Sequence, residues 1–232
     1  MPDQKIIITL DGWSSCGKST LAKALARALG YVFVDSGAMY RAITLFFIRN
    51  QVNIADSMAV EKALGSIELQ FVFNPARGAS DIFLNGENVE TSIREMGVAS
   101  RVSEVAAIPR VRQFAVLQQQ RLGTEKGIVM DGRDIGPVVF PPAELKIFMT
   151  ADKEIRVQRR LREMQATDST VTASMVRENL EQRDYLDANR AESPLRQAID
   201  ARVLDNSSLS PEQQFEIALG WAHQVIDQSK GQ

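Results

Sequence analysis

A phosphate-binding motif stands near the start of the 232-residue chain. Residues Gly12 to Ser19 read GWSSCGKS and fit G-x-x-x-x-G-K-[ST] without a gap. The two glycines let the backbone curl so that its N–H groups point at phosphate oxygens, and the positive end of a following helix adds to the field. In such a loop the lysine reaches the β- and γ-phosphates, and the Ser hydroxyl ligates Mg²⁺. We therefore expect the triphosphate to be held by Gly12, Trp13, Ser14, Ser15, Cys16, Gly17, Lys18, Ser19 and Thr20.

Four further stretches carry arginine and aspartate. They are Asp35–Arg41 (DSGAMYR), Ser103–Arg112 (SEVAAIPRVR), Asp131–Asp134 (DGRD) and Arg183–Arg190 (RDYLDANR). Several guanidinium groups together suit a phosphate dianion, because each offers paired N–H donors to its oxygens. Taken alone, Asp134 is equally consistent with a loop cap. Arg183 and Asp187 are four residues apart on one helical face, which is equally consistent with a surface ion pair.

A strongly basic segment follows the last of the central motifs. Lys153 to Arg162 (KEIRVQRRLR) carries five positive charges and one negative. Arg156 and Arg160 are one helical turn apart, and Arg159 lies beside them. A solvated helix face is the usual setting of such a run. The alternative is a cationic lid that closes over bound phosphates.

These motifs lie where predicted strands and helices meet. Short β-branched runs predict buried strands, and longer amphipathic runs predict helices. The expected strands are 5–10, 31–34, 127–130, 145–149 and 202–204, and the expected helices are 18–29, 38–50, 92–107, 109–122, 153–164, 169–190 and 211–228. Strands that alternate with helices imply parallel βαβ units. We therefore predict an α/β fold, a P-loop NTPase core whose parallel sheet is covered by helices on both faces.

One stretch breaks this alternation. Residues 66–73 alternate between polar and apolar, and one face is formed by Ile67, Leu69, Phe71 and Phe73. Asn85-Gly86, flanked by the segments 81–84 and 87–90, is a strong hairpin signal. We expect a small antiparallel β insert over about 64–92. The core is then residues 1–36 and 127–232, including a lid over about 152–168, and residues 37–126 form a separate arm.

The composition excludes several classes of protein. Lys plus Arg number 27 and Asp plus Glu 29, a net charge of −2, which argues against a binder of nucleic acid or of anionic membranes. Arginine outnumbers lysine 19 to 8, which is consistent either with a focused site for a small anion or with a genomic preference. The apolar runs are too short to span a bilayer, and residues 1–5 lack a signal-peptide pattern. We expect a cytoplasmic protein.

The single cysteine, Cys16, excludes a disulfide framework within the chain and fits a reducing compartment. It occupies a variable position of the phosphate-binding motif, so we expect no catalytic role for its thiol. A thiol at the N-terminus of a helix reacts more readily than an ordinary one. We therefore expect mild sensitivity to thiol reagents, with protection by nucleotide.

Together, the loop and the charged motifs resemble the bacterial cytidylate kinases, which are relatives of adenylate kinase. The resemblance covers about Lys5 to Gln228 with the motifs in matching order, and the strings D-S-G-x-x-Y-R, D-G-R-D and R-D-x-x-D-x-x-R are highly specific in combination. It implies transfer of the γ-phosphoryl group of ATP, with Mg²⁺, to CMP or dCMP. In that family the β insert is part of the arm that binds the nucleoside monophosphate. We expect a monomer.

The resemblance assigns roles to individual residues of the acceptor site. In the family, arginines that match Arg41, Arg133 and Arg190 hold the acceptor phosphate. Residues that match Arg183 and Asp187 contact the pentose. Several guanidinium forks are the natural grip for a monophosphate dianion.

The cytosine ring is contacted in the family by side chains that match Ser36, Ser103, Arg112 and Asp134. Cytosine offers an exocyclic amine as donor and its N3 and O2 atoms as acceptors. An aspartate therefore suits the amine and an arginine the acceptors, and uracil inverts this pattern at N4 and N3.

The basic helix also gains a role from the resemblance, because arginines in this segment of the family approach the transferring phosphoryl group when the lid closes. Charge on the moving group is then stabilised by Lys18, Arg133, Arg156 and Arg160. We expect Ser19 to ligate Mg²⁺ and Asp131 to orient its waters; a structural cap is almost as consistent with Asp131. Asn206 and Ser207 follow the last strand, where this fold often holds the donor base.

The sequence departs from the family at Trp13, where proline is common. The residues that set the geometry of the loop are intact, so we expect ATP binding to be retained. Three other functions stay open at this point. They are a kinase for UMP, AMP or shikimate, a nucleotide-dependent binding protein without an acceptor, and an RNA-binding protein. The last is disfavoured by the net charge and by the lack of an aromatic stacking motif.

Overall fold

The computed structural model describes residues 5–74, 76, 79–166 and 168–229. Three predicted segments include residues outside that description, namely the N-terminal stretch (1–4), the β insert (75, 77 and 78) and the lid (167). No helix in the described ranges is long and apolar enough to cross a membrane.

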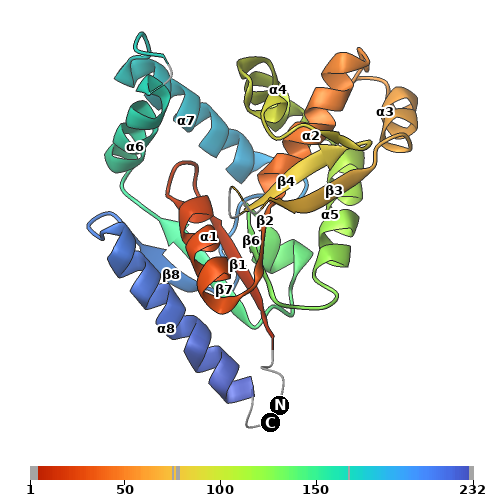
Figure 1. Ribbon diagram of the computed structural model, residues 1–232. Helices are drawn as coiled ribbons and strands as arrows, with labels where there is room; N and C mark the ends of the chain where they lie inside the picture. The colour runs from red at the N-terminus through yellow and green to blue at the C-terminus, as the bar shows by residue number, and fades with distance from the viewer. Residues whose placement is uncertain (1–4, 75, 77–78, 167, 230–232) are drawn as a thin grey trace.

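A parallel five-stranded sheet forms the centre of the molecule (Figure 1), in the strand order β2-β6-β1-β7-β8. Its strands are β1 (Ile7–Gly12), β2 (Val32–Asp35), β6 (Ile128–Asp131), β7 (Leu145–Thr150) and β8 (Arg202–Asp205). All five predicted core strands are confirmed, with ends that differ by one or two residues. Because β1 is the middle strand, its carboxyl end is flanked by a strand on each side. The phosphate-binding loop begins there.

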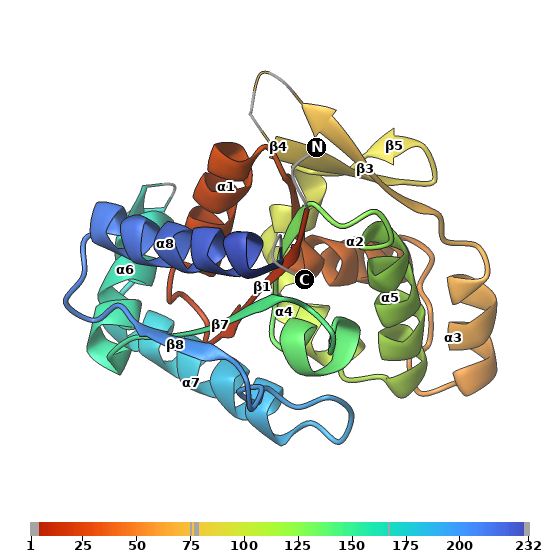
Figure 2. The same ribbon diagram turned by 90° about the horizontal axis from the view of Figure 1, so that it is seen from below.

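Helices cover both faces of this sheet, as predicted. α1 (Lys18–Leu29) and α8 (Pro211–Ser229) lie side by side over one face (Figure 2). The other face packs against a π-helical turn, η2 (Ile135–Val139), and α5 (Pro109–Leu122). Neighbouring residues of β1 point to opposite faces, so Ile8 joins the first apolar cluster and Ile7 the second.

A second body of structure is inserted between β2 and β6. It contains α2 (Ser36–Arg49), α3 (Ser57–Leu64), the 3-10 turn η1 (Ser92–Arg94), α4 (Met96–Ala106) and an antiparallel sheet of β3 (Leu69–Asn74), β4 (Ala79–Leu84) and β5 (Glu87–Asn88). Asn85 and Gly86 both have positive φ, at 50° and 83°, which confirms the predicted hairpin turn. These elements and α5 share one apolar cluster. The domain bounds at residues 36 and 127 stay predictions.

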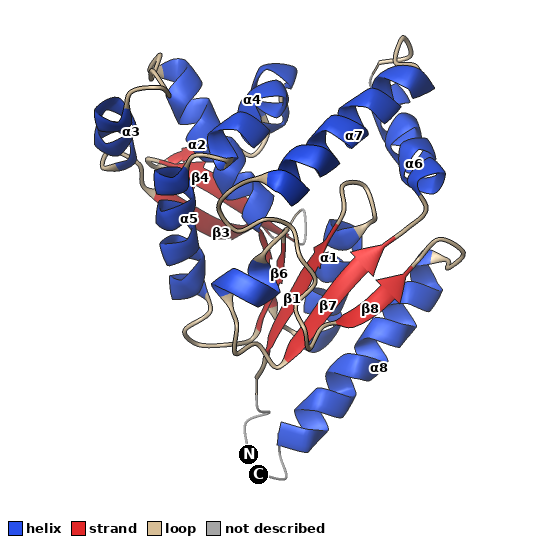
Figure 3. Cartoon of the chain, turned by 180° about the vertical axis from the view of Figure 1, so that it is seen from behind, coloured by secondary structure: helices blue, strands red, loops and turns tan. Residues whose placement is uncertain are grey.

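Two helices, α6 (Lys153–Gln165) and α7 (Ala173–Asn189), form a hairpin. It lies at the carboxyl ends of the central strands, opposite the inserted body (Figures 1 and 3). Val157 and Leu180 lie in a small apolar cluster between them. The basic segment is therefore a helix, as predicted, and it packs against the helix that carries the last charged motif.

The structure adds one helix and corrects three predicted elements. α3 was not predicted, although Asp56 caps it by accepting from the N–H groups of Met58 and Ala59. The helix expected over 92–107 is divided into η1 and α4, and the one expected over 169–190 starts at Ala173. The insert strand expected over 66–73 starts at Leu69. Phe73 of this strand is 65% exposed, so the predicted apolar face does not extend to its end.

Candidate functional site

The phosphate-binding loop is shaped by its backbone. Gly12 has φ of 145°, and a Cβ at this position would lie 2.1 Å from the carbonyl oxygen of Met149 on β7. Only glycine fits there, because the loop leaves the sheet in contact with the neighbouring strand. Ser15 and Gly17 also have positive φ, at 59° and 90°. The sequence from β1 to α1 thus curls as the motif predicts.

Lys18 lies inside this loop and is 6% exposed. Its Nζ donates to the carbonyl oxygens of Gly12 (2.9 Å) and Trp13 (2.7 Å). Burial, followed by the charge of Arg133, lowers the pKa of Lys18. Phosphate oxygens would compete with these backbone carbonyls for the ammonium group of Lys18. The half-buried Trp13 takes part in the loop through its backbone carbonyl.

Cys16 is completely buried, and its Sγ donates to the carbonyl oxygen of Trp13 at 3.0 Å. Reagents in solution do not reach a thiol without exposed surface. The expected sensitivity to thiol reagents therefore requires an opening of the loop that exposes the thiol, and it stays a prediction.

Ser19, at the start of α1, donates its hydroxyl to Oδ2 of Asp131 at 2.5 Å. Burial and the nearby charge of Asp35 raise the pKa of Asp131 to about 6. Its other oxygen, Oδ1, is buried and has no hydrogen-bond partner in the described part of the chain. The two residues predicted to serve a metal ion are thus brought together, and a carboxylate oxygen remains free. Ser36 closes this edge by donating to the backbone oxygen of Asp131 at 2.6 Å.

Arg133 joins the loop to α7. Its Nη2 donates to the hydroxyl of Ser14 at 3.0 Å, and its Nε donates to Oδ2 of Asp187 at 2.7 Å. The guanidinium group therefore lies between the phosphate-binding loop and the last charged motif, as its two predicted roles require.

Arg112 and Arg190 meet at one carboxylate. Arg112 pairs with Oδ2 of Asp134, and Nη2 of Arg190 donates to Oδ1 at 3.2 Å. The three side chains have between 3% and 8% of their surface exposed. The guanidinium of Arg112 also lies 5.3 Å from the centre of the Tyr40 ring. Asp134 precedes η2 and makes no side-chain cap hydrogen bond to it, so the alternative of a loop cap does not hold.

A cluster of arginines surrounds Arg183. Burial is the main cause that lowers its pKa to about 10, and the charges of Arg133, Arg160 and Arg41 lower it further. Asp187 opposes this effect but does not cancel it. The Nε atoms of Arg41, Arg160 and Arg183 are buried and have no hydrogen-bond partner among the residues described. Positive charge is thus concentrated beside the loop with donors left over, which is the arrangement expected for an anion site.

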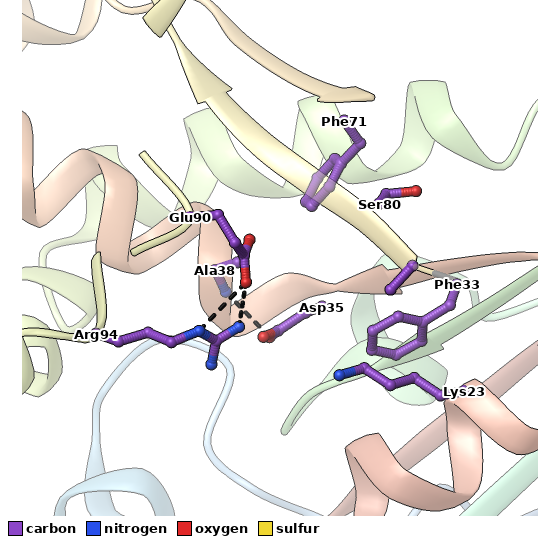
Figure 4. Close-up of a pocket in the computed structure, with 9 residues that line it drawn as sticks. Lys23, Phe33, Asp35, Ala38, Phe71, Ser80, Glu90 and Arg94 are labelled. Carbon is purple, nitrogen blue, oxygen red and sulfur yellow. Dashed lines mark hydrogen bonds and ion pairs between the residues drawn. The ribbon is translucent and has the colours of Figure 1, made fainter. Parts of the chain in front are cut away.

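Arg41 is anchored at the end of β2. Its Nη2 donates to Oδ2 of Asp35 at 2.7 Å, and Oδ1 of the same carboxylate accepts from the N–H of Ala38 and caps α2. The charges of Arg41 and Arg94 hold the pKa of Asp35 below its usual value. Figure 4 shows the crevice on this side, where Arg94 pairs with Glu90 next to Asp35. Its volume of about 10 Å³ has room for about one water molecule and excludes a nucleotide.

A larger cleft, of about 190 Å³, lies between α4 and α7. Its polar lining includes Ser103, Asp187 and Arg190, three of the residues predicted to contact the acceptor. Its apolar lining is provided by Ala107 and Leu186. The cleft continues the site from the arginine cluster toward the arm.

The lid arginines differ in their surroundings. Arg156 is 9% exposed in its side chain and contacts both the loop and Asp184. Arg160 pairs with Glu163 at 2.8 Å within its own helix. Arg159 donates to the side-chain and backbone oxygens of Asn206, both at 2.9 Å. The charge run is therefore not a uniformly solvated face.

Asn206 does not lie free for a donor base. It is completely buried, and its Nδ2 donates to the backbone oxygen of Cys16 and to Oε1 of Gln214, each at 2.7 Å. Its amide is used to support the phosphate-binding loop from the side of β8, so the expectation of a base contact is wrong for this residue. Ser207 is occupied locally, since its hydroxyl donates to Asp205 and accepts from the N–H of Asp152.

Two further acids belong to the site and were not predicted. Asp11 is buried directly before the loop and accepts from the N–H groups of Ile135 (2.8 Å) and Gly136 (2.7 Å), which fixes the turn that follows Arg133. Asp184 contacts the loop and the lid together. Asp11 had a signal in the sequence, an acid at the end of an apolar strand. For Asp184, only its place in the Arg183–Arg190 motif pointed to the site.

Comparison with known proteins gives one consistent result. The family model described as cytidylate kinase matches residues 8–224. A cytidylate kinase of Bacteroides thetaiotaomicron is 54% identical over 216 residues, 92% of this chain and 94% of that protein. One of Flavobacterium psychrophilum is 52% identical over 225 residues, 96% of this chain and all of that protein.

Among solved structures, an uncharacterized protein from Eubacterium ventriosum has a TM-score of 0.50 over 97% of this chain and 99% of its own. Its sequence identity is 12%, so this likeness concerns the fold alone. The family model and the two sequence relatives span almost the whole length, including the loop, the arginine cluster and the α6–α7 hairpin. On this evidence the chain belongs to the cytidylate kinase family.

Proposed function

We propose that this protein transfers the γ-phosphoryl group of ATP to CMP or dCMP and releases ADP with CDP or dCDP. The observation that carries the proposal is the arginine cluster around Arg183, which lies beside a complete phosphate-binding loop. A second anion beside the loop would meet the buried Nε donors of Arg41, Arg160 and Arg183, which have no hydrogen-bond partner among the described residues. The names of the relatives support a cytosine nucleotide as that anion.

In this proposal the acceptor phosphate is held by Arg41, Arg133 and Arg190, and Arg183 adds a fourth cation where phosphate and pentose meet. Asp35 pairs with Arg41, and Asp187 pairs with Arg133. Preformed guanidinium forks lose little side-chain freedom on binding, which favours a tight grip on a dianion. No general base is needed, because the acceptor phosphate is itself largely anionic.

Cytosine recognition is assigned to the buried pair of Arg112 and Asp134, together with Ser36 and Ser103. Arg190, which holds the acceptor phosphate in this proposal, also pairs with Asp134. Each oxygen of the Asp134 carboxylate accepts one arginine in this structure. A carboxylate has about four lone-pair sites, so it can still accept from an exocyclic amine. Uracil would present a carbonyl oxygen to this carboxylate, which is repulsive.

The residues at the loop fit a bound Mg²⁺ ion. Hard cations take oxygen ligands, and the Ser19 hydroxyl is bonded to the carboxylate of Asp131, whose Oδ1 has no hydrogen-bond partner among the described residues. We assign the ion to Ser19, with Asp131 holding its waters. When bound, Mg²⁺ neutralises charge on the triphosphate.

Transfer itself depends on position and on charge stabilisation. Lys18 is released from the carbonyls of Gly12 and Trp13 to the phosphates, and Arg133, Arg156 and Arg160 approach the group in transit. Closure of the α6–α7 hairpin toward the arm excludes water. It thereby favours transfer to the acceptor over hydrolysis of ATP.

The test is an acceptor profile. ADP release is measured in a coupled assay with ATP and, in turn, CMP, dCMP, UMP, AMP and shikimate, and the CDP or dCDP product is identified by chromatography. We expect CMP and dCMP to give the highest kcat/KM. A preference for UMP, AMP or shikimate would contradict the assignment of Asp134 and Arg112. ATP binding without CDP formation would point to a binding protein.

Two variants locate the recognition of cytosine. Asp134→Ala removes the acceptor for the amine, and we expect kcat/KM for CMP to fall about tenfold to a hundredfold while discrimination against UMP is lost. Ser103→Ala, at a half-buried position of the cleft, is expected to raise KM for CMP more mildly and to leave KM for ATP unchanged. Thermal unfolding confirms that each variant is folded. Unchanged CMP selectivity in a folded Asp134→Ala would refute the recognition model.

A further inference from the structure

Three ion pairs connect α6 to α7, and they differ in burial. They are Lys153–Glu181, Glu154–Arg177 and Arg156–Asp184. In the first two, between 41% and 60% of each side chain is exposed. In the third, Arg156 is 9% and Asp184 15% exposed. Exposed ion pairs contribute little to stability, so the two outer pairs fasten the hairpin only weakly. The inner pair is mostly buried, and the loss of one partner would leave the other charge uncompensated.

The inner pair is also the one that faces the phosphate-binding loop. Oδ2 of Asp184 accepts from Nη1 of Arg156 at 2.5 Å, and Oδ1 accepts from the backbone N–H of Ser14 at 3.2 Å. One carboxylate thus contacts the lid helix with one oxygen and the loop with the other. No other acid on α7 is described in contact with the loop.

Arg156 is held from three directions. Its Nη1 donates to the backbone oxygen of Ser14 as well as to Asp184, and its Nε donates to the backbone oxygen of Ala151 (both backbone bonds are 3.2 Å). These acceptors come from the loop, from α7 and from the end of β7. A free arginine side chain has many rotamers, and contacts of this kind restrict them. In this protein the three acceptors fix the direction of the guanidinium group.

We propose that Asp184 is a positioning residue for phosphoryl transfer, which keeps the guanidinium of Arg156 aimed at the phosphate-binding loop. This inference rests on the proposed function. Asp184 acts through Arg156 and not on the acceptor, since the acceptor residues of the same helix, Arg183 and Asp187, contact a separate group of side chains. A displacement of a reacting or charge-stabilising group by about 1 Å costs about a hundredfold in rate.

The simpler alternative is that Asp184 only fastens α6 to α7. The outer pairs provide a matched control for this alternative, because Glu181 lies one turn before Asp184 on α7 and pairs with the same helix. Fastening predicts similar effects from Asp184→Asn and Glu181→Gln. Positioning predicts an effect on kcat from the first variant only.

The experiment measures kcat and KM for CMP and for ATP in the wild type, Asp184→Asn and Glu181→Gln. We expect Asp184→Asn to lower kcat about tenfold to a hundredfold with KM for CMP unchanged, and Glu181→Gln to match the wild type. An unchanged kcat in Asp184→Asn, or an equal loss in both variants, would overturn the proposal. A wild type that makes no CDP would instead refute the proposed function.

A double-mutant comparison separates positioning from an independent effect. If Asp184 acts only through Arg156, Arg156→Met and the double variant Arg156→Met/Asp184→Asn have the same kcat. A further loss in the double variant would show that Asp184 acts by another route, and the proposal would fail. Thermal unfolding checks that Arg156→Met, which leaves Asp184 without its partner, and the double variant, which leaves neither charge unpaired, are both folded.

Discussion

The phosphate-binding loop and the acceptor side of the cleft are built in different ways. In the loop, Lys18 contacts carbonyl oxygens only five and six positions earlier in the chain. On the acceptor side, Arg112, Arg133 and Arg190 are held by acids from distant segments, whereas Arg41 is held by Asp35, six positions earlier in the chain. Arg133 and Asp187 are 54 positions apart, and Arg112 and Asp134 are 22 apart.

This difference determines what each region needs in order to exist. The loop requires local backbone geometry at Gly12 and Gly17 and a following helix, and a contiguous motif provides both. The acceptor side exists only when α5, the β6 turn and α7 have assembled, and its cations are then already paired with Asp35, Asp134 and Asp187. The shape of the loop thus depends on backbone geometry, and the acceptor side depends on ion pairs between side chains.

The largest effect is expected from Lys18→Met, which tests the first half of this comparison. Loss of the charge on the phosphates is expected to lower kcat by about a thousandfold and to weaken ATP binding. Because the backbone shapes the loop, the temperature of unfolding without ligand is expected to stay close to that of the wild type. Steady-state kinetics, ATP titration and thermal unfolding measure the three quantities.

Lys23→Met is the control for Lys18→Met, since Lys23 lies on the same helix with its Nζ 5.5 Å from the centre of the Phe33 ring, away from the loop. It is expected to retain the wild-type kcat. An unfolded Lys18→Met beside a folded Lys23→Met would show that the side chain, and not the backbone, maintains the loop.

The next effect, from Arg183→Met, tests the charge balance on the acceptor side. Burial and the charges of Arg133, Arg160 and Arg41 lower the pKa of Arg183 to about 10, so its charge destabilises the empty protein. We expect the unfolding temperature of the variant without ligand to be a few degrees higher than that of the wild type. For a protein of this size, each kcal/mol of unfolding free energy shifts that temperature by about 2–4 °C. Its kcat/KM for CMP is expected to fall about tenfold to a hundredfold.

The readout for Arg183→Met is thermal unfolding with and without CMP, together with CMP kinetics. Stabilisation by CMP is expected to be smaller in the variant than in the wild type. A variant that is less stable without ligand would mean that Asp187 outweighs the neighbouring arginines, and the idea of an unmatched cationic cluster would then be wrong.

The same contrast explains how much could be predicted from the sequence. The parallel core, the hairpin insert and the loop were predicted correctly, because strand periodicity, Asn85-Gly86 and the phosphate-binding motif are local signals. The residues that converge on the acceptor were named through the family resemblance. Their pairing, for example both Arg112 and Arg190 on Asp134, depends on tertiary contacts that no spacing encodes.

The misses have the same origin. α3 is short and is stabilised by its Asp56 cap and by burial of Val60 and Leu64 against the arm, so its periodic signal is weak. Asn206 was placed near the donor base from its position after β8, but its contacts are made with the loop and α8. Exposure of Cys16 could not be read from the motif either, because the direction of a loop side chain depends on the local turn.

A smaller effect, on stability, is expected at Asp11, which joins the two regions. Burial and the charge of Asp134 raise its pKa to about 7, against the lowering effects of the Ile135 and Gly136 N–H groups and Lys18. The native state therefore keeps a proton that the unfolded chain releases near its ordinary value. Stability from this group is present at low pH and is lost as the pH rises from about 4 to about 7.

Asp11→Asn removes this titration. In the wild type, each carboxylate oxygen of Asp11 accepts one N–H bond, from Ile135 or Gly136. The asparagine side chain has an NH₂ group in place of one of these oxygens and loses that bond, so we expect the variant to be less stable than the wild type at low pH. Its relative stability is expected to improve as the pH rises, by on the order of 1 kcal/mol per pH unit at most. Urea unfolding of both proteins across this range measures the difference. A difference that is constant with pH would contradict the protonated state of Asp11.

The smallest effect is expected from Arg110→Gln in the arm. This variant tests whether an exposed ion pair outside the cleft matters as the buried pairs of the acceptor side do. Arg110 pairs with Glu61 between α5 and α3, and each side chain has 54% of its surface exposed. Water and salt screen such a pair, so its loss leaves no buried charge uncompensated, in contrast to the pairs of Arg112 or Arg133. We expect unchanged kcat, unchanged KM for CMP and an unchanged unfolding temperature. A clear rise in KM for CMP would show that an exposed ion pair far from the cleft also affects the position of the arm. Acceptor binding would then depend on more than the ion pairs of the buried arginines.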